Sequence, residues 1–215
     1  PVQFGLAVIP ILLVTSALVA AQLPPRFGAV LATYYCATLA YSLHFKKVFL
    51  LDAIVLAGLY TLRIIAGHEA TGLAYSPWLL CFSMFFFFSL ALVKRFSDLL
   101  AVRAQGRAVS LGRGYGAGDL DQLAQLGTSS AMIAILILAL YISSDAVQLL
   151  YHHVWALWLM CPLLLYWISR IWTLARAGNL RGDPIVFTLN DPVSYVSGMC
   201  ALMILVVAGS DWGAT

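Results

Sequence analysis

The sequence predicts an all-α protein, a polytopic bundle of transmembrane helices, on three observations. Of its 215 residues, 62% are hydrophobic and only 10% are charged, whereas about a quarter of the residues in soluble domains carry a charge. Seven apolar runs approach or reach the roughly 17 to 25 residues that a membrane span needs. Most basic residues fall in alternate connections between these runs, as the positive-inside rule requires. The net charge of +3 is small and no basic run forms a patch, which argues against nucleic acid as a partner.

The predicted spans, in chain order, cover residues 4–22, 28–44, 50–67, 77–97, 128–143, 149–169 and 192–209. Helix-breaking residues predict turns between them, at Pro24-Pro25, Gly67, Ser76-Pro77, Gly127 and the two Asp-Pro pairs at 183–184 and 191–192. No fixed-period repeat or low-complexity linker divides the chain, so residues 1–215 are predicted to form a single transmembrane domain. The chain does not start with Met, and we expect it to be truncated at its N-terminus.

The basic residues predict an orientation in the membrane. With residue 1 on the cytoplasmic side, the connections 45–49, 94–127 and 170–191 face the cytoplasm and hold ten of the twelve Lys and Arg residues. The other two are Arg26 and Arg63. Two of these three connections are long, and long loops on one face of a rigid scaffold are where binding sites are built. The sequence therefore predicts an integral protein of a bacterial-type inner (plasma) membrane with its polar site on the cytoplasmic face.

The fourth span ends in three charged residues, which are the catalytic candidates. An apolar run with four consecutive Phe stops at Lys94, Arg95 and Asp98, and this spacing brings the three side chains together on one helical turn. One interpretation is that Asp98 pairs with its helix neighbours while the two cations anchor the span at the headgroups. The functional interpretation is that Lys94 and Arg95 bind a phosphate, the arginine in bidentate fashion, and that Asp98 orients them or ligates Mg²⁺.

The connection before the third span supplies substrate-binding candidates. Tyr41, Lys46 and Lys47 precede Asp52, which the third span carries into the apolar zone. A carboxylate there costs about 2–3 kcal/mol unless it is paired or faces water. A functional acid and a salt bridge to a neighbouring loop lysine are equally good interpretations of Asp52.

The connection 99–127 is rich in glycine and charge. It lacks the GxxxxGK[ST] pattern of a phosphate-binding loop, and we interpret it as a flexible lid over the cytoplasmic site, with contributions from Arg113, Tyr115, Asp119 and Asp121.

Arg63 lies about 16 Å beyond Asp52 along the third span. It is expected to have a structural role, either by snorkelling outward or by pairing with Glu69.

Several segments resemble the UbiA prenyltransferase superfamily, with the greatest likeness to the branch of decaprenyl-phosphate phosphoribosyltransferase. They are YSLHFKK (41–47), LDAIVLAGLYTLRIIAG (51–67), SPWLLCFSMFFFFSLALVKRFSDL (76–99), RGYGAGDLDQLAQLGTSSAM (113–132) and RGDPIVFTLNDPVSYVSG (181–198). The resemblance implies a nine-helix bundle of which this chain lacks the first two helices, together with a first acidic motif of the NDxxDxxxD type. The place of the second motif, DxxxD, is taken by residues 94–98, which match one carboxylate, Asp98.

The resemblance also implies the activity. It predicts a Mg²⁺-dependent transferase that moves a prenyl group from a diphosphate donor to an acceptor, with a polyprenyl lipid and membrane lipids as its partners. The lysine in the second motif suits a reaction with additional phosphate, such as the transfer of 5-phosphoribose from its diphosphate to a polyprenyl phosphate. Two further alternatives are a lipid transporter without catalysis and a fragment that is inactive by itself.

Overall fold

A computed structural model of the chain describes residues 2–73, 75–104, 106, 114–180 and 184–210, and all regular structure in this part is helical. The predicted all-α fold is confirmed. In chain order the elements are α1 (Val2–Ala20), α2 (Pro25–Leu43), η1 (Phe45–Lys47), α3 (Leu51–Thr71), α4 (Pro77–Ala104), η2 (Ala117–Asp119), α5 (Leu120–Ile142), α6 (Asp145–Leu150), α7 (Val154–Leu157), α8 (Met160–Arg176), α9 (Pro184–Thr188) and α10 (Pro192–Gly209).

Five helical segments are long and apolar enough to cross a membrane: α3, α4, α5, the run 154–176 that contains α7 and α8, and α10. Helices also occupy the first two predicted spans, and α1 carries no charged residue and includes the apolar run Val8–Ala20. α2 has 19 residues and carries tyrosines, threonines and a serine along its length. The protein is therefore an integral membrane bundle, in which α2 is more polar than α1.

Three details of the predicted spans are wrong. The fifth helix begins at Leu120 and not at residue 128, because Gly127 lies inside α5 rather than in a turn. Gly67 likewise lies inside α3. The sixth predicted span is interrupted between α6, α7 and α8. At Gly127 a neighbouring helix needs the space, because a Cβ atom there would meet the Trp172 ring. Nothing lies within 4 Å of the Cβ position of Gly67, so close packing does not explain that glycine.

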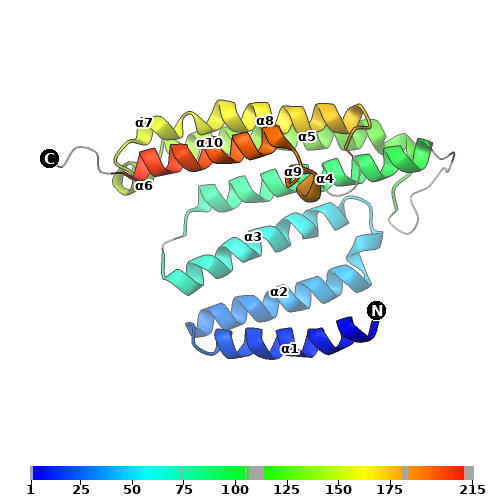
Figure 1. Ribbon diagram of the computed structural model, residues 1–215, viewed down its shortest axis with the longest axis horizontal. Helices are drawn as coiled ribbons and strands as arrows, with labels where there is room; N and C mark the ends of the chain where they lie inside the picture. Colours follow the sequence, from blue (N-terminus) through cyan, green and yellow to red (C-terminus); the bar gives the residue numbers. More distant parts are fainter. Residues whose placement is uncertain (1, 74, 105, 107–113, 181–183, 211–215) are drawn as a thin grey trace.

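The helices pack largely in chain order, α2 on α3, α3 on α4, α4 on α5, α5 on α8 and α8 on α10 (Figure 1). α4 is the central helix because it also contacts α8 and α9. The larger core cluster draws on α3, α4, α5 and α8, and a smaller one joins the end of α5 to α6, α7 and α10. The exposed side chains of α1 and α10 are mostly large and apolar, as expected of surfaces that face lipid.

Small polar residues hold α4, α5 and α8 together. Ser89 donates a hydrogen bond to the carbonyl of Gly127 (2.7 Å) and accepts one from the Trp172 indole nitrogen (3.1 Å). Ser130 donates to the carbonyl of Phe85 (2.8 Å). A Cβ atom on Gly127 would lie 2.0 Å from the Trp172 ring. The helices thus approach closely through small residues and interhelical hydrogen bonds, as membrane helices do.

Candidate functional site

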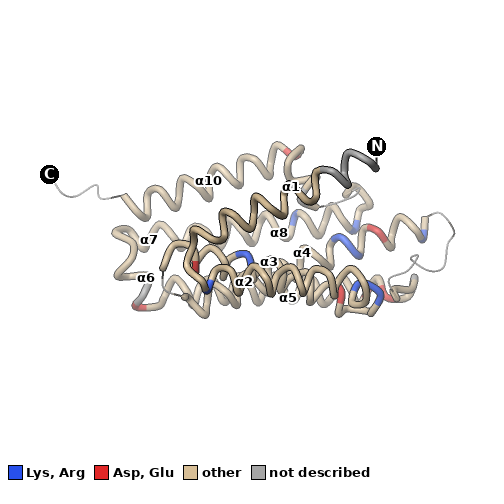
Figure 2. The backbone as a smooth tube through the Cα atoms, turned by 90° about the horizontal axis from the view of Figure 1, so that it is seen from below, with Lys and Arg blue, Asp and Glu red and all other residues tan. Residues whose placement is uncertain are grey.

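Most charged residues of the bundle gather at one end, the right-hand end in Figure 2. At this end α2, α4 and α8 finish and α3 and α5 begin. The described basic residues on the elements that meet there are Lys46, Lys47, Lys94, Arg95, Arg103, Arg170 and Arg176. We call this the charged end. The clustering agrees with the grouping of connections in the sequence, while the assignment of this end to the cytoplasm stays a prediction.

Arg95 is the centre of a buried polar cluster at the charged end, although it lies within the longest apolar helix. Only 4% of the residue is exposed. Its Nε donates to Asp52 Oδ2 (2.5 Å) and its Nη2 donates to Tyr41 Oη (3.2 Å). Its Nη1 lies 3.6 Å from the Asp98 carboxylate, one turn further along α4. Nη1 is fully buried and makes no hydrogen bond within the part of the chain that the structure describes.

Asp52 is completely buried in the first turn of α3, where the helix dipole favours a negative charge. Its Oδ2 accepts from Arg95, and its Oδ1 accepts from the backbone N–H of Ala53 (2.7 Å) and from the Tyr115 hydroxyl. The predicted salt bridge to a loop lysine is therefore wrong in its partner. The acid is paired, but with an arginine 43 residues further along the chain.

Tyr115 closes the cluster from the connection between α4 and α5. It is 2% exposed, and its hydroxyl donates to Asp52 while accepting from the Leu50 N–H (3.2 Å). Burial, followed by the hydrogen bond to Asp52, raises the pKa of Tyr115 above that of a free tyrosine. Its hydroxyl therefore stays protonated and acts as a donor at neutral pH.

Two residues next to the Tyr115 contact, Leu50 and Gly114, have positive φ angles. Leu50 has a φ of 59°, a positive value that is unusual for a residue with a side chain. Gly114 has a φ of 69°, and a Cβ atom there would lie 2.9 Å from the Lys47 carbonyl oxygen. Strained conformations of this kind persist where surrounding contacts hold them, and they concentrate at functional sites.

The remaining predicted site residues lie around this cluster, except for one that is not among the described residues. Lys46 and Lys47 are exposed on η1, and Lys94 and Asp98 are partly exposed on α4. Arg113 lies outside the described residues. The structure thus brings Tyr41, Asp52, Arg95, Asp98 and Tyr115 together, and it leaves their catalytic and substrate-binding roles as predictions.

The described residues do not by themselves make a magnesium site. Within residues 2–73, 75–104, 106, 114–180 and 184–210, no three His, Cys, Asp or Glu side chains form a group that could hold a metal ion. Both oxygens of Asp52 are engaged by protein donors. Asp98 is the other carboxylate near Arg95. A single carboxylate holds Mg²⁺ only together with substrate phosphates and water.

Sequence reasoning missed a second ion pair at the charged end. Arg170 donates from Nη1 and Nη2 to the two oxygens of Asp191 (2.6 and 2.9 Å). Asp191 also caps α10, accepting from the backbone N–H (2.9 Å) and hydroxyl (2.7 Å) of Ser194. These hydrogen bonds lower the pKa of Asp191 to about 2, and the bond from Arg170 has the largest effect. The Asp191-Pro192 pair was predicted to mark a turn before the last span, and α10 does begin at Pro192, but no local signal points to Arg170.

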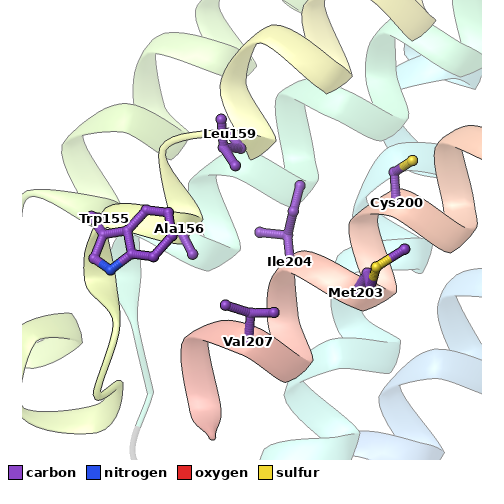
Figure 3. Close-up of a pocket in the computed structure, with 7 residues that line it drawn as sticks. All are labelled: Trp155, Ala156, Leu159, Cys200, Met203, Ile204 and Val207. Carbon is purple, nitrogen blue, oxygen red and sulfur yellow. The ribbon is translucent and has the colours of Figure 1, made fainter. Parts of the chain in front are cut away.

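An apolar pocket of about 370 Å³ lies far from the charged end, between α7, the start of α8 and the last turns of α10 (Figure 3). Its lining side chains are Trp155, Ala156, Leu159, Cys200, Met203, Ile204 and Val207. This lining offers no charge to a phosphate. The pocket is suited to an alkyl chain. It is not an alternative to the Arg95 cluster as a binding site for a charged group.

These features define an integral membrane protein with an all-α bundle and a buried arginine–aspartate cluster at its charged end. The chain is 39% identical over 201 residues to the uncharacterized protein y4nM of Sinorhizobium fredii, an alignment that covers 92% of this chain and 39% of y4nM. It is 32% identical over 171 residues to the nodulation protein NoeC of Azorhizobium caulinodans, covering 80% of this chain and 56% of NoeC.

The chain thus spans between about two fifths and just over half of the length of these curated relatives. No family model matches it. The resemblance to the UbiA superfamily therefore stays a prediction.

Proposed function

We propose that this chain is part of a membrane-embedded transferase of the UbiA type, which uses a diphosphate donor and a polyprenyl substrate. The observation that carries the proposal is the buried Nη1 of Arg95, which has no hydrogen-bond partner among the described residues. A buried donor of this kind needs an acceptor. Since Nη1 lies beside Asp98 and next to Lys94 in the chain, a phosphate oxygen is the acceptor that this charge pattern suits best.

The arrangement supports stabilisation of a leaving diphosphate. In prenyl transfer the bond from C1 of the prenyl group to the diphosphate oxygen breaks while a bond to the acceptor forms, so negative charge grows on the diphosphate. Lys94 and Nη1 of Arg95 are the groups that would offset this charge. Since Nε and Nη2 of Arg95 are already hydrogen-bonded to Asp52 and Tyr41, we assign the phosphate contact to Nη1 alone rather than to a bidentate grip.

Asp52 has a positioning role in this proposal, because all its described contacts are with protein donors. Asp98 is the carboxylate that would share Mg²⁺ with the phosphate oxygens, and the metal would supply further charge neutralisation. Lys46 and Lys47, exposed at the same end, are placed to attract an anionic donor from solution.

The same site also suits transfer of 5-phosphoribose from its diphosphate to a polyprenyl phosphate. In that reaction a phosphate oxygen of the lipid bonds to the anomeric carbon as diphosphate leaves, so the site must neutralise more phosphate charge. A lysine in place of the first carboxylate of the second acidic motif favours this variant over simple prenyl transfer.

The proposal is tested in membranes that contain the full-length protein. Lys94→Ala and Asp98→Ala are the informative variants, because both side chains are partly exposed and their removal leaves the core intact. Each is expected to lower product formation by about 100-fold or more, the loss typical of a removed charge-stabilising donor. Parallel reactions with labelled prenyl diphosphate and labelled phosphoribosyl diphosphate distinguish the two transfers.

Arg103→Ala is the matched control, since this exposed arginine lies on the last turn of the same helix. It should leave turnover close to that of the unaltered protein. Near-normal turnover of both Lys94→Ala and Asp98→Ala would rule out the assigned site.

A lipid transporter is the second candidate, and Arg63 is the observation in its favour, because transporters carry ionisable groups deep within their spans. Reconstituted vesicles separate the two candidates. Product formation without net movement of the lipid supports the transferase, whereas lipid movement in the absence of any donor supports the transporter.

A further inference from the structure

Arg63 lies near the middle of a membrane-spanning helix and is exposed there. It is twelve residues from the start of α3 and eight from its end, so it stands about 18 Å and about 12 Å from the two ends of a helix about 30 Å long. Arginines close to a helix end reach the headgroups by snorkelling, but Arg63 is remote from both ends. A charge at this depth is costly unless it pairs or faces water.

The contacts of Arg63 are with aromatic residues. Its Nε and Nη2 donate to the Tyr34 hydroxyl (3.2 and 2.6 Å). Its guanidinium carbon lies 5.3 Å from the centre of the Tyr34 ring and 4.9 Å from that of Tyr60. The Tyr60 ring in turn stacks on Phe87 at 4.6 Å. These rings orient the guanidinium and stabilise its charge, but none of them neutralises it.

No carboxylate pairs with Arg63 in the part of the chain that the structure describes. Pairing with Glu69 was one of the two alternatives expected for Arg63. Glu69 instead accepts a hydrogen bond from the Tyr75 hydroxyl, so this alternative is wrong. Nη1 of Arg63 makes no hydrogen bond to any described residue. The site therefore offers a full positive charge and unused donors to a group that comes from elsewhere.

One face of α2 links Arg63 to the charged end. Tyr34 and Tyr41 are seven residues apart, two helical turns on the same face and about 10 Å along the axis. Tyr41 accepts from Arg95 and Tyr34 accepts from Arg63. Among its described residues, α2 buries none. Two tyrosine hydroxyls on this face thus lie between the charged end and Arg63, one bonded to each arginine.

We propose that Arg63, Tyr34 and Tyr60 form a second anion-binding site at mid-membrane depth, distinct from the Arg95 cluster. Its ligand is the phosphate or carboxylate group of an amphiphile or of a small anion that enters along α2. The guanidinium supplies the charge and the Nη1 donors, and the two tyrosines hold it in one orientation. The site does not depend on the transfer reaction, so each of the two proposals can fail without the other.

Cysteine accessibility tests whether this position is wet and positive. In the full-length protein, Cys36, Cys81, Cys161, Cys200 and any cysteine outside residues 1–215 are replaced by Ser. Ala37→Cys then places a thiol on the face shared by Tyr34 and Tyr41. In phosphatidylcholine nanodiscs we compare an anionic and a cationic methanethiosulfonate reagent, each normalised to its rate with a free thiol. The anionic reagent is expected to be favoured by about tenfold, because an unscreened arginine attracts one reagent and repels the other.

Variants of Arg63 test whether the preference comes from its charge, and a cysteine at a lipid-facing position of similar depth serves as the control. Arg63→Gln should abolish the preference, and Arg63→Lys should retain it. Leu202→Cys, an exposed mid-helix position on α10, should react slowly with both reagents because it faces lipid. A thiol at position 37 that reacts as slowly as the one at 202, or a preference that survives in Arg63→Gln, would overturn the proposal.

Protection experiments identify the source of the anion. Inorganic phosphate and nanodiscs containing phosphatidylglycerol are each tested for slowing of the anionic reagent at Ala37→Cys by about tenfold. Protection by phosphate alone assigns the site to a soluble anion, and protection by phosphatidylglycerol assigns it to a lipid headgroup. The absence of protection by both would reduce Arg63 to a hydrated cation and contradict the binding site.

Discussion

At the scale of single residues, the burial of Arg95 is tolerated because of Asp52, and the burial of Asp52 because of Arg95. Each is a charge removed from water within an apolar bundle, and each is tolerated because the other is hydrogen-bonded to it. Tyr41 and Tyr115 satisfy further donors and acceptors of the pair. Arg95 thereby ties α4 to α2 and α3, and Asp52 ties this contact to the connection that precedes α5.

Breaking this pair is expected to destabilise the protein strongly. Asp52→Asn or Arg95→Gln should each lower the free energy of unfolding by about 3–5 kcal/mol, because each leaves an uncompensated buried charge. Denaturant titration in detergent micelles measures the loss. The double variant should cost less than the sum of the single ones, and Arg103→Gln should cost little. Additive losses would show that the two charges are not coupled.

The Arg170–Asp191 pair makes stability depend on pH. The pKa of Asp191 falls from about 3.9 in an unfolded chain to about 2 in the fold, so the folded state favours the carboxylate. Its contribution is fully present above the unfolded pKa and is lost as the pH falls toward about 2. The difference in unfolding temperature between the unaltered protein and Asp191→Asn should therefore be constant from pH 7 to about 5 and shrink below about 4. A difference that persists unchanged at pH 2.5 would contradict this.

At the scale of elements, the helices that meet most closely do so through small residues. Ser89 and Gly127 allow α4, α5 and α8 to share one hydrogen-bonded contact with Trp172. In lipid the hydrophobic effect does not drive helices together, so this close packing is what holds them.

Gly127→Ala tests this contact. A methyl group would overlap the Trp172 ring, since the Cβ position lies 2.0 Å from it, and overpacking of this kind costs about 1–3 kcal/mol. The variant should unfold at a lower temperature in detergent. Gly58→Ala on α3 is the matched control, because nothing lies within 4 Å of its Cβ position, and it should be neutral or slightly stabilising. Equal behaviour of the two variants would show that Trp172 moves aside freely.

At the scale of the whole molecule, the charged end is the feature that relates the bundle to its membrane. The basic residues at this end predict that it stays in the cytoplasm. Reporter fusions check the orientation. A green fluorescent protein fused after Arg103 should fluoresce, and an alkaline phosphatase fused after Gly72 should be active because it is exported. The reverse pattern would place the Arg95 cluster on the opposite side of the membrane.

Much of the fold and part of the site followed from the sequence. The apolar runs predicted helices at their positions, and the boundaries failed where glycines served packing, as at Gly127, rather than turns. Lys94, Arg95 and Asp98 were predicted because they interrupt an apolar run, and Asp52 because it enters one. The structure brings Arg95, Asp52 and Asp98 together, and the roles of all four stay predictions. Arg170 was missed because its partner Asp191 lies 21 residues away and each residue alone looks like an ordinary helix end.

The sequence by itself determined that this protein is an all-α membrane bundle with its charges at one end. In hydrocarbon every backbone polar group must be satisfied within its own segment, so a long apolar run leaves the chain little choice but a helix. Only the tertiary structure decided which charges meet. Arg95, Asp52, Tyr41 and Tyr115 are brought together across 43 to 63 residues, because their contacts depend on how neighbouring helices are rotated and packed. That information is distributed over whole interfaces and is not carried by any single stretch of the chain.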